Sequence, residues 1–350
     1  MTQKEKNHYD IIHIVRIFHP NIGGMENLVH EIANRQVKQG KRVLVITSDL
    51  TRDGHKVDVV LDKNYEVYRV ESFLLKGVFI PKHILTKFPA CKTLHCHGMD
   101  PMVDFLTLKI KFQQLIISPH GGFFHTPNFL FLKKIYFNTI SKFITLYQPK
   151  YYCISQNDIE LVSRISENVY FMGCGSASIK FNLGSEGVLT FGRIAPNKCI
   201  NDAIKVFEQY FESEKFVVAG PNPEKLNIEL SEGVEYLGPV TAETLEELIN
   251  QSKYFISMSS YEGLGMALIE AIKGGLIPIV RNIDAYKHID MLIKETTGGQ
   301  SSIKFVDDDM LFETTESLEC SDDLLVACAD AANTIWCWDS VVQKLNENNI

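Results

Sequence analysis

The sequence lacks the features of a membrane-spanning, secreted, disulfide-stabilised or zinc-stabilised protein. No apolar run reaches the roughly 18 residues of a membrane-spanning helix, and the start, MTQKEKNHYD, has no apolar stretch of the secretory kind. The eight cysteines form no Cys-x-x-Cys pair, and most lie in apolar segments. We therefore expect reduced core thiols and a cytoplasmic location.

Other absences narrow the class of function. The Gly-x-Gly-x-x-Gly fingerprint of dinucleotide-binding proteins is missing, which counts against a dehydrogenase. The basic residues are scattered and belong to no recognised nucleic-acid-binding module, so no nucleic acid is expected as a partner. The composition is that of a globular protein, because 45% of the 350 residues are hydrophobic and 22% are charged. This length suffices for about two domains.

Charge is divided unevenly between the two halves of the chain. Residues 1–180 carry 23 Lys and Arg against 15 Asp and Glu, whereas residues 181–350 carry 12 against 28. In the basic half, residues 129–152 interleave lysines with Phe, Tyr, Ile and Leu, a composition typical of a helix at a membrane surface. A core-packed helix with a solvated lysine face explains the same pattern equally well.

Strand and helix patterns alternate along the chain. Residues 11–18 predict a strand, residues 24–40 a helix and residues 41–48 the next strand. The same order resumes at residues 188–194, after a loop at 173–187 that is rich in Gly, Ser and Asn and coincides with the change of charge. We therefore predict an α/β fold of two Rossmann-like, doubly wound domains facing a central cleft at the carboxyl ends of their strands.

Two glycines mark the start of the first predicted helix. Gly23 and Gly24 stand in HPNIGGMEN, between a strand and a helix. Backbone amides at such a position favour a phosphate or a similar anion. A tight strand-to-helix turn accounts for the pair as well.

A pair of cations and a pair of carboxylates stand in the second half. Arg193 and Lys198 follow its first strand, where they can hold a diphosphate from two sides or form a solvated basic loop. In YEGLGMALIE, Glu262 precedes a predicted helix and Glu270 lies roughly 8 to 10 Å further along its axis. Because a carboxylate accepts two hydrogen bonds side by side, each suits a vicinal diol. A nucleotide sugar has such diols in its sugar and its ribose.

His95 and His97 share one face of a strand in LHCHGMD. A metal pair is conceivable, but the sequence supplies no acidic third ligand. We favour a polar strand end on the acceptor side of the cleft, with Asp100 nearby as a base or an acceptor contact.

Together these motifs resemble the retaining GT-B glycosyltransferases of family 4. The resemblance rests on Glu-x7-Glu after a strand, Gly-Arg with a lysine five residues on, the first-loop Gly-Gly and His120 at the end of a first-domain strand. It runs nearly the whole chain, since IWCWDSVVQKL is similar to the family's closing Trp-containing helix, which crosses back to the first domain. The implied limits are 1–180 for the acceptor-side domain, 181–335 for the nucleotide-sugar domain and 336–350 for the closing helix.

The resemblance also implies roles for the matching residues. Glu262 and His120 would be catalytic, beside the donor sugar. The donor-binding residues would be Gly23, Gly24, Arg193, Lys198, Gly263, Leu264, Gly265 and Glu270. It implies no metal and no other cofactor, since cationic side chains and helix dipoles would neutralise the leaving diphosphate.

SPHGGFFHT, followed by a lysine-bearing aromatic segment, resembles the bacterial exopolysaccharide and O-antigen branch of that family. That branch extends a sugar on polyprenyl diphosphate and includes mannosyltransferases that use GDP-mannose. The resemblance implies hexose transfer from GDP-mannose or a UDP-hexose to a glycan, at the cytoplasmic face of the inner membrane. The acceptor-side residues would be His97, Asp100, Phe123, Phe124 and His125.

Three other functions fit the same fold. They are a nucleotide-sugar epimerase, a glycan phosphorylase and a non-catalytic subunit that binds a sugar nucleotide. After Glu270 the family pattern usually continues through a glycine-containing loop, whereas VRNIDAYKHID has no glycine. This departure implies a different nucleotide or sugar preference.

Overall fold

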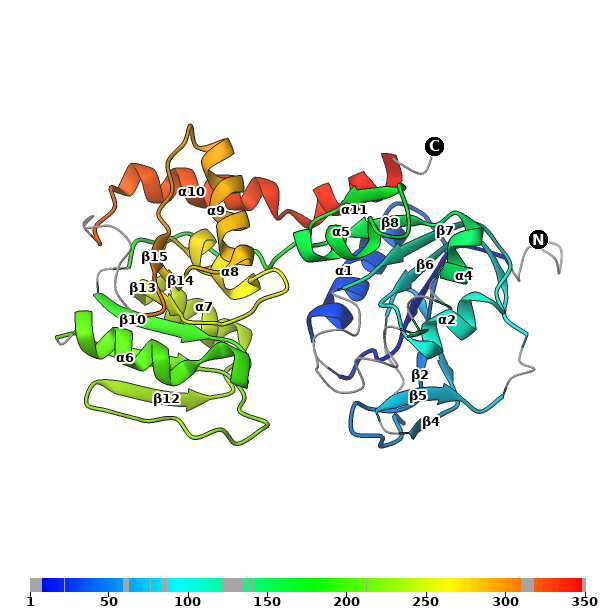
Figure 1. Ribbon diagram of the computed structural model, residues 1–350, viewed down its shortest axis with the longest axis horizontal. Coiled ribbons are helices and arrows are strands. Elements are labelled where there is room, and N and C mark those ends of the chain that lie inside the picture. The colour runs from blue at the N-terminus through cyan, green and yellow to red at the C-terminus, as the bar shows by residue number, and fades with distance from the viewer. Residues whose placement is uncertain are drawn as a thin grey trace. The chain divides into compact units, whose positions relative to one another are not determined.

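The chain forms two compact units. Unit 1 comprises Met1–Gly175 and Trp338–Ile350, and unit 2 comprises Ser176–Cys337 (Figure 1). The chain passes from unit 1 to unit 2 between Gly175 and Ser176, within the loop at 173–187 where the sequence predicts a boundary. The computed structural model describes residues 8–21, 23–58, 63–75, 77–83, 87–120, 135–136, 139, 142–184, 186–211, 213–309 and 318–347.

Unit 1 is built on a seven-stranded parallel sheet of order β3-β2-β1-β6-β7-β8-β9. A separate antiparallel hairpin pairs β4 with β5. The strands of unit 1 are β1 (His8–Val15), β2 (Val43–Ser48), β3 (Glu66–Val70), β4 (Ser72–Leu75), β5 (Val78–Pro81), β6 (Ala90–His97), β7 (Phe112–Ser118), β8 (Lys150–Cys153) and β9 (Val169–Phe171). Its described helices are α1 (Gly24–Lys38), α2 (Pro101–Thr107), α4 (Lys142–Ile144), η3 (Thr145–Tyr147), α5 (Gln156–Val162) and α11 (Trp338–Glu347).

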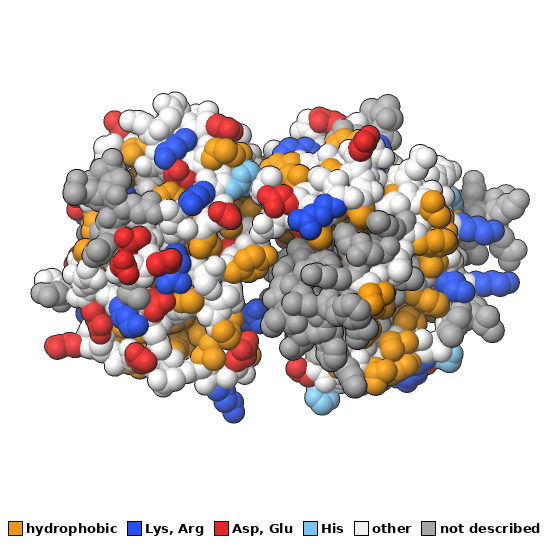
Figure 2. All heavy atoms as spheres, in the orientation of Figure 1, with side chains coloured by type: hydrophobic (Ala, Val, Ile, Leu, Met, Phe, Trp, Pro, Cys, Tyr) orange, Lys and Arg blue, Asp and Glu red, His pale blue; other side chains and the backbone are white. Residues whose placement is uncertain are grey.

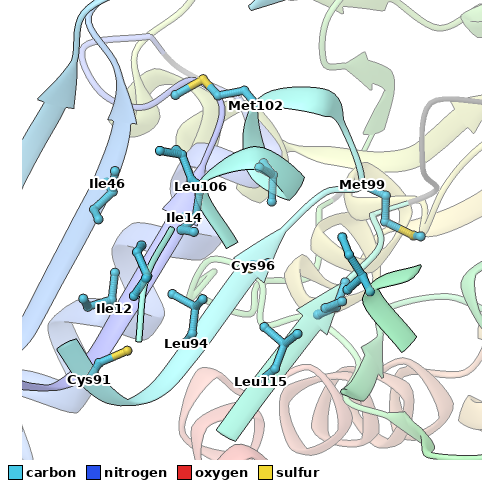
Figure 3. Packing of buried hydrophobic residues seen from close by; sticks show 14 of the residues in the cluster. Ile12, Ile14, Ile46, Cys91, Leu94, Cys96, Met99, Met102, Leu106 and Leu115 are labelled. Atoms are coloured by element: carbon cyan, nitrogen blue, oxygen red, sulfur yellow. The ribbon is translucent and has the colours of Figure 1, made fainter. Parts of the chain in front are cut away.

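The central strands of unit 1 are buried on both faces, as parallel strands covered by helices are. On one face, Ile12, Ile14 and Leu94 pack in a cluster with Met102 and Leu106 of α2 (Figure 3). The other face meets α1. This burial explains why β1 is an almost continuous apolar run. His13 is an exception, because it is a polar side chain buried within that run.

Unit 2 repeats the scheme with a six-stranded parallel sheet of order β12-β11-β10-β13-β14-β15. Its strands are β10 (Glu186–Phe191), β11 (Phe216–Ala219), β12 (Val234–Gly238), β13 (Ser252–Ser257), β14 (Ile277–Arg281) and β15 (Lys304–Val306). Its described helices are η4 (Pro196–Lys198), α6 (Ile200–Tyr210), α7 (Ala242–Gln251), α8 (Met266–Gly274), α9 (Asp284–Thr296) and α10 (Asp322–Ile335). Val188, Phe207, Phe216, Ile256 and Ile279 lie in its core.

Each sheet has one point where the strand order reverses. In unit 1 the chain runs outward from β1 to β3 and then returns to β6, beside β1. In unit 2 it runs from β10 to β12 and returns to β13, beside β10. Ligands of doubly wound sheets bind outside the carboxyl ends of the strands at such reversals. The loops after β1, β6, β10 and β13 are therefore the places to seek a site.

The predicted closing helix differs in detail. Helix α10 ends at Ile335 and α11 begins at Trp338, so Trp336 and Cys337 separate two helices. The second of these belongs to unit 1 and lies against α1, where Arg35 Nε donates to an Asp339 carboxylate oxygen at 2.8 Å. Trp338 also packs so tightly on Gly175 that a Cβ there would lie 2.1 Å from the ring.

The remaining global predictions concern thiols, membranes and charge. All eight cysteines are free, and five are buried. Among the described residues, no helix is long and apolar enough to cross a membrane. Much of the predicted surface helix at 129–152 lies outside the described residues, and its end forms α4, η3 and the start of β8. On the face shown in Figure 2, acidic side chains of unit 2 are interspersed with Lys and Arg.

Candidate active site

The loops that follow β10 and β13 are fixed to each other in unit 2. The two strands pair in parallel, so their carboxyl ends lie side by side. The amide of Ser260 donates to the backbone carbonyl of Asn197 at 2.8 Å, and Asn197 Nδ2 donates to the carbonyl of Tyr261 at 2.9 Å. These bonds place the segments that carry Lys198 and Glu262 in contact.

One carboxylate oxygen of Glu262 is the centre of this contact. It accepts hydrogen bonds from Lys198 Nζ at 2.6 Å, Ser259 Oγ at 2.8 Å and the Tyr286 hydroxyl at 3.3 Å. The Lys198 and Glu262 side chains are only 25% and 11% exposed, so their attraction is screened less than that of a surface pair. The residues predicted to hold the diphosphate and the sugar are thus immediate neighbours, although those roles stay predictions.

The sequence analysis missed the residues that support Glu262. Ser257 Oγ lies 2.7 Å from the Tyr286 hydroxyl and 3.2 Å from Ser259 Oγ, which completes a small hydroxyl network. The two serines had a usable signal, because Ser257 ends β13 and Ser259 lies between that strand and Glu262. Tyr286 had none, since it reaches Glu262 from α9, 24 positions further along the chain.

Arg193 lies beside a pocket that Gly192, Lys198, Ser257 and Ala267 also line. Its side chain is exposed, and within the described part of the chain nothing forms an ion pair with it. A guanidinium in this position can bind an anion without first breaking an internal pair. This arrangement supports the predicted diphosphate contact.

The turn into α8 is set by glycine. The helix begins at Met266, so Glu262 lies just before it. Gly265 caps it with φ of +84°, in the left-handed region, and a Cβ there would lie 2.8 Å from Cε1 of Tyr286. Gly263 differs, because a Cβ on it would meet nothing within 4 Å. Gly265 is therefore needed by the fold, whereas Gly263 leaves open space beside Glu262.

Substituting Gly265 by alanine should destabilise the protein by about 1 to 3 kcal/mol, since it adds both backbone strain and a clash with Tyr286. Gly299→Ala is the matched control, because Gly299 has φ of +96° but open space around its Cβ position. Urea unfolding should show a larger loss for Gly265→Ala than for Gly299→Ala. Equal losses would mean that the Tyr286 contact is unimportant.

Glu270 lies within α8 and is largely buried. Burial raises the pKa of its carboxyl to about 7, against the opposing effects of a hydrogen bond from the Ala177 backbone and the charge of Lys273. The neutral acid and the carboxylate are therefore both populated near neutral pH. Only the carboxylate accepts two hydrogen bonds from a diol without donating one.

The predicted phosphate site of unit 1 already contains a carboxylate. Helix α1 begins at Gly24, and Gly23 is its N-cap. The side chain of Glu26 folds back so closely that a Cβ on Gly23 would lie 2.3 Å from its Oε2, and its other oxygen accepts from Arg52 at 3.2 Å. A phosphate at Gly23 and Gly24 would have to displace this acid, and the contact stays a prediction.

Three histidines lie on the face of the unit 1 sheet that α1 covers. The register of β1 and β6 sets His13 opposite His95, and His97 lies two residues on, on the same face. His13 Nε2 lies 2.8 Å from Oε1 of Gln36, on α1. All four side chains are buried.

His97 connects this cluster to His120, which follows β7. The Nε2 atom of His97 lies 2.9 Å from Nδ1 of His13, and the Nδ1 atom of His97 lies 3.2 Å from Nε2 of His120. His95 bonds elsewhere, through Nε2 to Ser118 Oγ at 2.9 Å. The predicted catalytic histidine is therefore the end of a buried polar chain.

Burial keeps these imidazoles neutral. It lowers the pKa of His13 and of His120 to about 4, and it lowers the pKa values of His95 and His97 well below the usual range. One ring nitrogen from each of His13, His95 and His97 lies within 4.8 Å of the others, so the three could hold a metal ion. Hydrogen bonds already engage nitrogens of all three rings. The absence of a metal requirement stays a prediction.

The structure describes two of the predicted acceptor-side residues, His97 and Asp100. His97 is fully buried, and its polar contacts are with two other histidines. Asp100 caps α2 by accepting from two backbone amides, and its second oxygen lies 3.9 Å from Arg16. Any acceptor contact of either residue stays a prediction. The other members of the set, Phe123, Phe124 and His125, lie outside the described residues.

Comparison with known proteins shows which family and which enzymes the chain is similar to. Residues 176–319 match the family described as Glycosyl transferases group 1. The chain is 25% identical over 306 residues to GDP-mannose:cellobiosyl-diphosphopolyprenol alpha-mannosyltransferase of Xanthomonas oryzae pv. oryzae, covering 79% of each protein. It is 26% identical over 303 residues to the enzyme of the same description from Komagataeibacter xylinus, covering 80% of this chain and 77% of that one.

A solved structure gives the same fold. Sucrose-phosphate synthase from Thermosynechococcus elongatus superposes with a TM-score of 0.68 at 14% identity, over 96% of this chain and 97% of that one. The chain has the GT-B fold, which confirms the predicted architecture. It is a glycosyltransferase, and residues 176–319, most of unit 2, are its group 1 glycosyltransferase region.

Proposed function

We propose that this chain transfers mannose from GDP-mannose to a glycan carried on polyprenyl diphosphate, with retention of the anomeric configuration, in bacterial surface polysaccharide synthesis. The names of two relatives, each matched over more than three quarters of its length, support the donor and the acceptor class. The observation that carries the proposal is the Lys198–Glu262 pair at the strand reversal of unit 2. It sets a cation for a diphosphate beside a carboxylate for a sugar.

In the proposed reaction, Glu262, Arg193 and Lys198 act on the donor. Glu262 accepts hydrogen bonds from the donor sugar, while Arg193 and Lys198 stabilise the negative charge that develops on the leaving diphosphate. The bond between the anomeric carbon and the diphosphate oxygen breaks, and the acceptor oxygen bonds to that carbon from the same face. The acceptor proton passes to the departing phosphate oxygen.

The direct test is an assay of the full-length protein with GDP-mannose or UDP-glucose and a synthetic cellobiosyl-diphosphopolyprenol. We expect a mannosylated lipid whose new linkage is α by proton NMR, and slower or no transfer from UDP-glucose. Controls without acceptor and with added inorganic phosphate separate the other functions of the same fold. An epimerised donor, or glycan cleavage that depends on phosphate, would contradict the proposal.

Glu270 should make donor binding depend on pH. We propose that its carboxylate binds the ribose diol, and the charged fraction rises as pH increases through its pKa of about 7. The KM for the donor should therefore fall about tenfold between pH 6 and pH 8. Glu270→Gln cannot ionise, so the same pH series measured on it should be flat. A parallel fall in both proteins would assign the titration to another group.

We also propose that unit 1 binds the surface of the membrane that holds the acceptor. Supporting this, Phe143, Leu146 and Tyr147 are 50%, 73% and 44% exposed, in a segment predicted to lie at a membrane surface. Exposed apolar side chains among basic residues suit the boundary of an anionic bilayer.

Leu146→Asp should therefore reduce co-sedimentation with anionic phospholipid vesicles several-fold. Leu230→Asp is the control, because Leu230 is 57% exposed in unit 2. If both variants sediment with vesicles as the parent protein does, the predicted surface is not the one that binds.

A further inference from the structure

A hydrogen-bonded chain of four side chains runs through unit 1, from Gln36 through His13 and His97 to His120. The successive distances are 2.8 Å, 2.9 Å and 3.2 Å. Gln36 is 3% exposed, and His13 and His97 are fully buried. Because water cannot readily substitute for a partner at such depth, each link constrains the next.

Gln36 sets which atom donates and which accepts in every link of this hydrogen-bonded chain. A neutral imidazole has one N–H donor and one acceptor nitrogen, and Oε1 of Gln36 can only accept. His13 Nε2 therefore carries the proton, so its Nδ1 must accept from His97 Nε2. His97 Nδ1 in turn accepts from His120 Nε2. The outcome is one tautomer of His120, with its proton on Nε2 and a lone pair on Nδ1.

The backbone conformation of His120 and the stacking of its ring both restrict the orientation of the imidazole. The φ of His120 is +53°, in the left-handed region, which is strained for a residue other than glycine. Its ring stacks on His97 with centroids 5.5 Å apart and planes 21° apart. In the part of the chain that the structure describes, no residue hydrogen-bonds to its Nδ1. The ring is thus held through its Nε2 side by His97.

We propose that Gln36, His13 and His97 are positioning residues that hold His120 in this single tautomer and present its unprotonated Nδ1 to a substrate hydroxyl. That the hydroxyl belongs to a sugar rests on the proposed function. The tautomer itself does not, and it can be observed without substrate.

The test is long-range proton–nitrogen NMR of the full-length protein with ¹⁵N-labelled histidine, with the His120 signals assigned by their loss in His120→Asn. Wild type should show His120 protonated on Nε2 alone. Gln36→Leu removes the acceptor that sets the direction, so its His120 should show a mixture of tautomers and kcat should fall about tenfold at nearly constant donor KM. Gln36→Glu retains an acceptor and should restore the single tautomer and most of kcat.

Gln39→Leu is the matched control, since Gln39 is exposed at the end of the same helix and should leave spectrum and kcat unchanged. A wild-type His120 protonated on Nδ1, or an unchanged His120 spectrum in Gln36→Leu, would overturn the proposal that the hydrogen-bonded side chains set the tautomer of His120. Stoichiometric metal bound by His13, His95 and His97 would overturn it as well, because coordination would consume their lone pairs. The expected tautomers in a protein that transfers no sugar would instead refute the proposed function and leave the chain intact.

Discussion

Glu262→Ala is expected to lower kcat/KM for sugar transfer about a thousandfold, equivalent to roughly 4 kcal/mol of transition-state stabilisation. The substitution removes the carboxylate proposed to hold the donor sugar. It also removes the acceptor for Lys198, Ser259 and Tyr286, so the hydroxyl network behind the site loses its centre. Steady-state kinetics with varied donor would measure the effect.

Two further variants test whether the loss comes from the charge of Glu262 and whether it is specific to this position. Glu262→Gln keeps an oxygen acceptor but loses the charge, so we expect an intermediate loss if the carboxylate's charge contributes. Glu247→Ala is the control, since Glu247 is exposed on α7 of the same unit. Turnover near the wild-type rate in Glu262→Ala, with correct folding by circular dichroism, would refute the site assignment.

Lys198→Ala should lower kcat/KM about a hundredfold, the second largest effect that we expect. The proposed leaving diphosphate loses one of its two cations, and Glu262 loses the partner at 2.6 Å. Because Lys198 and Glu262 are in contact, the double alanine variant should lose less than the product of the single losses. Lys215→Ala supplies an exposed lysine on the same unit as a control.

The measured quantity is again kcat/KM, now over a double-mutant cycle. Strictly multiplicative losses at positions 198 and 262 would show that the two side chains act independently. In that case the close pair seen here would not be maintained during turnover.

The sequence was enough to place those residues of the candidate site whose position depends on local order. Alternating strands and helices implied two doubly wound sheets, and residues after the first strand of the second half had to lie at a strand reversal. Lys198 and Glu262 were found in this way, although their direct ion pair was not. Their contact depends on how Asn197 joins the two loops, which no pattern of residue types encodes.

The buried histidine chain shows the limit of sequence reasoning more clearly. His13 reads as an interruption of an apolar strand, and Gln36 as one polar residue of a helix. Their link to His97 spans 84 positions and requires both the pairing of β1 with β6 and the rotation of α1 over the sheet. Such contacts follow from register and helix packing, which the sequence constrains only through the whole fold.

The division of the chain into units has a consequence for how the protein is made. Unit 2 is a continuous segment, whereas unit 1 takes its last helix, α11, from the end of the chain. Domains fold as units while the ribosome adds residues in order. The second unit in sequence can thus finish folding first, while the first waits for its final ten-residue helix to be synthesised. Until then the face of α1 that receives Asp339 stays uncovered, and a released chain truncated after residue 337 would carry one complete unit and one incomplete one.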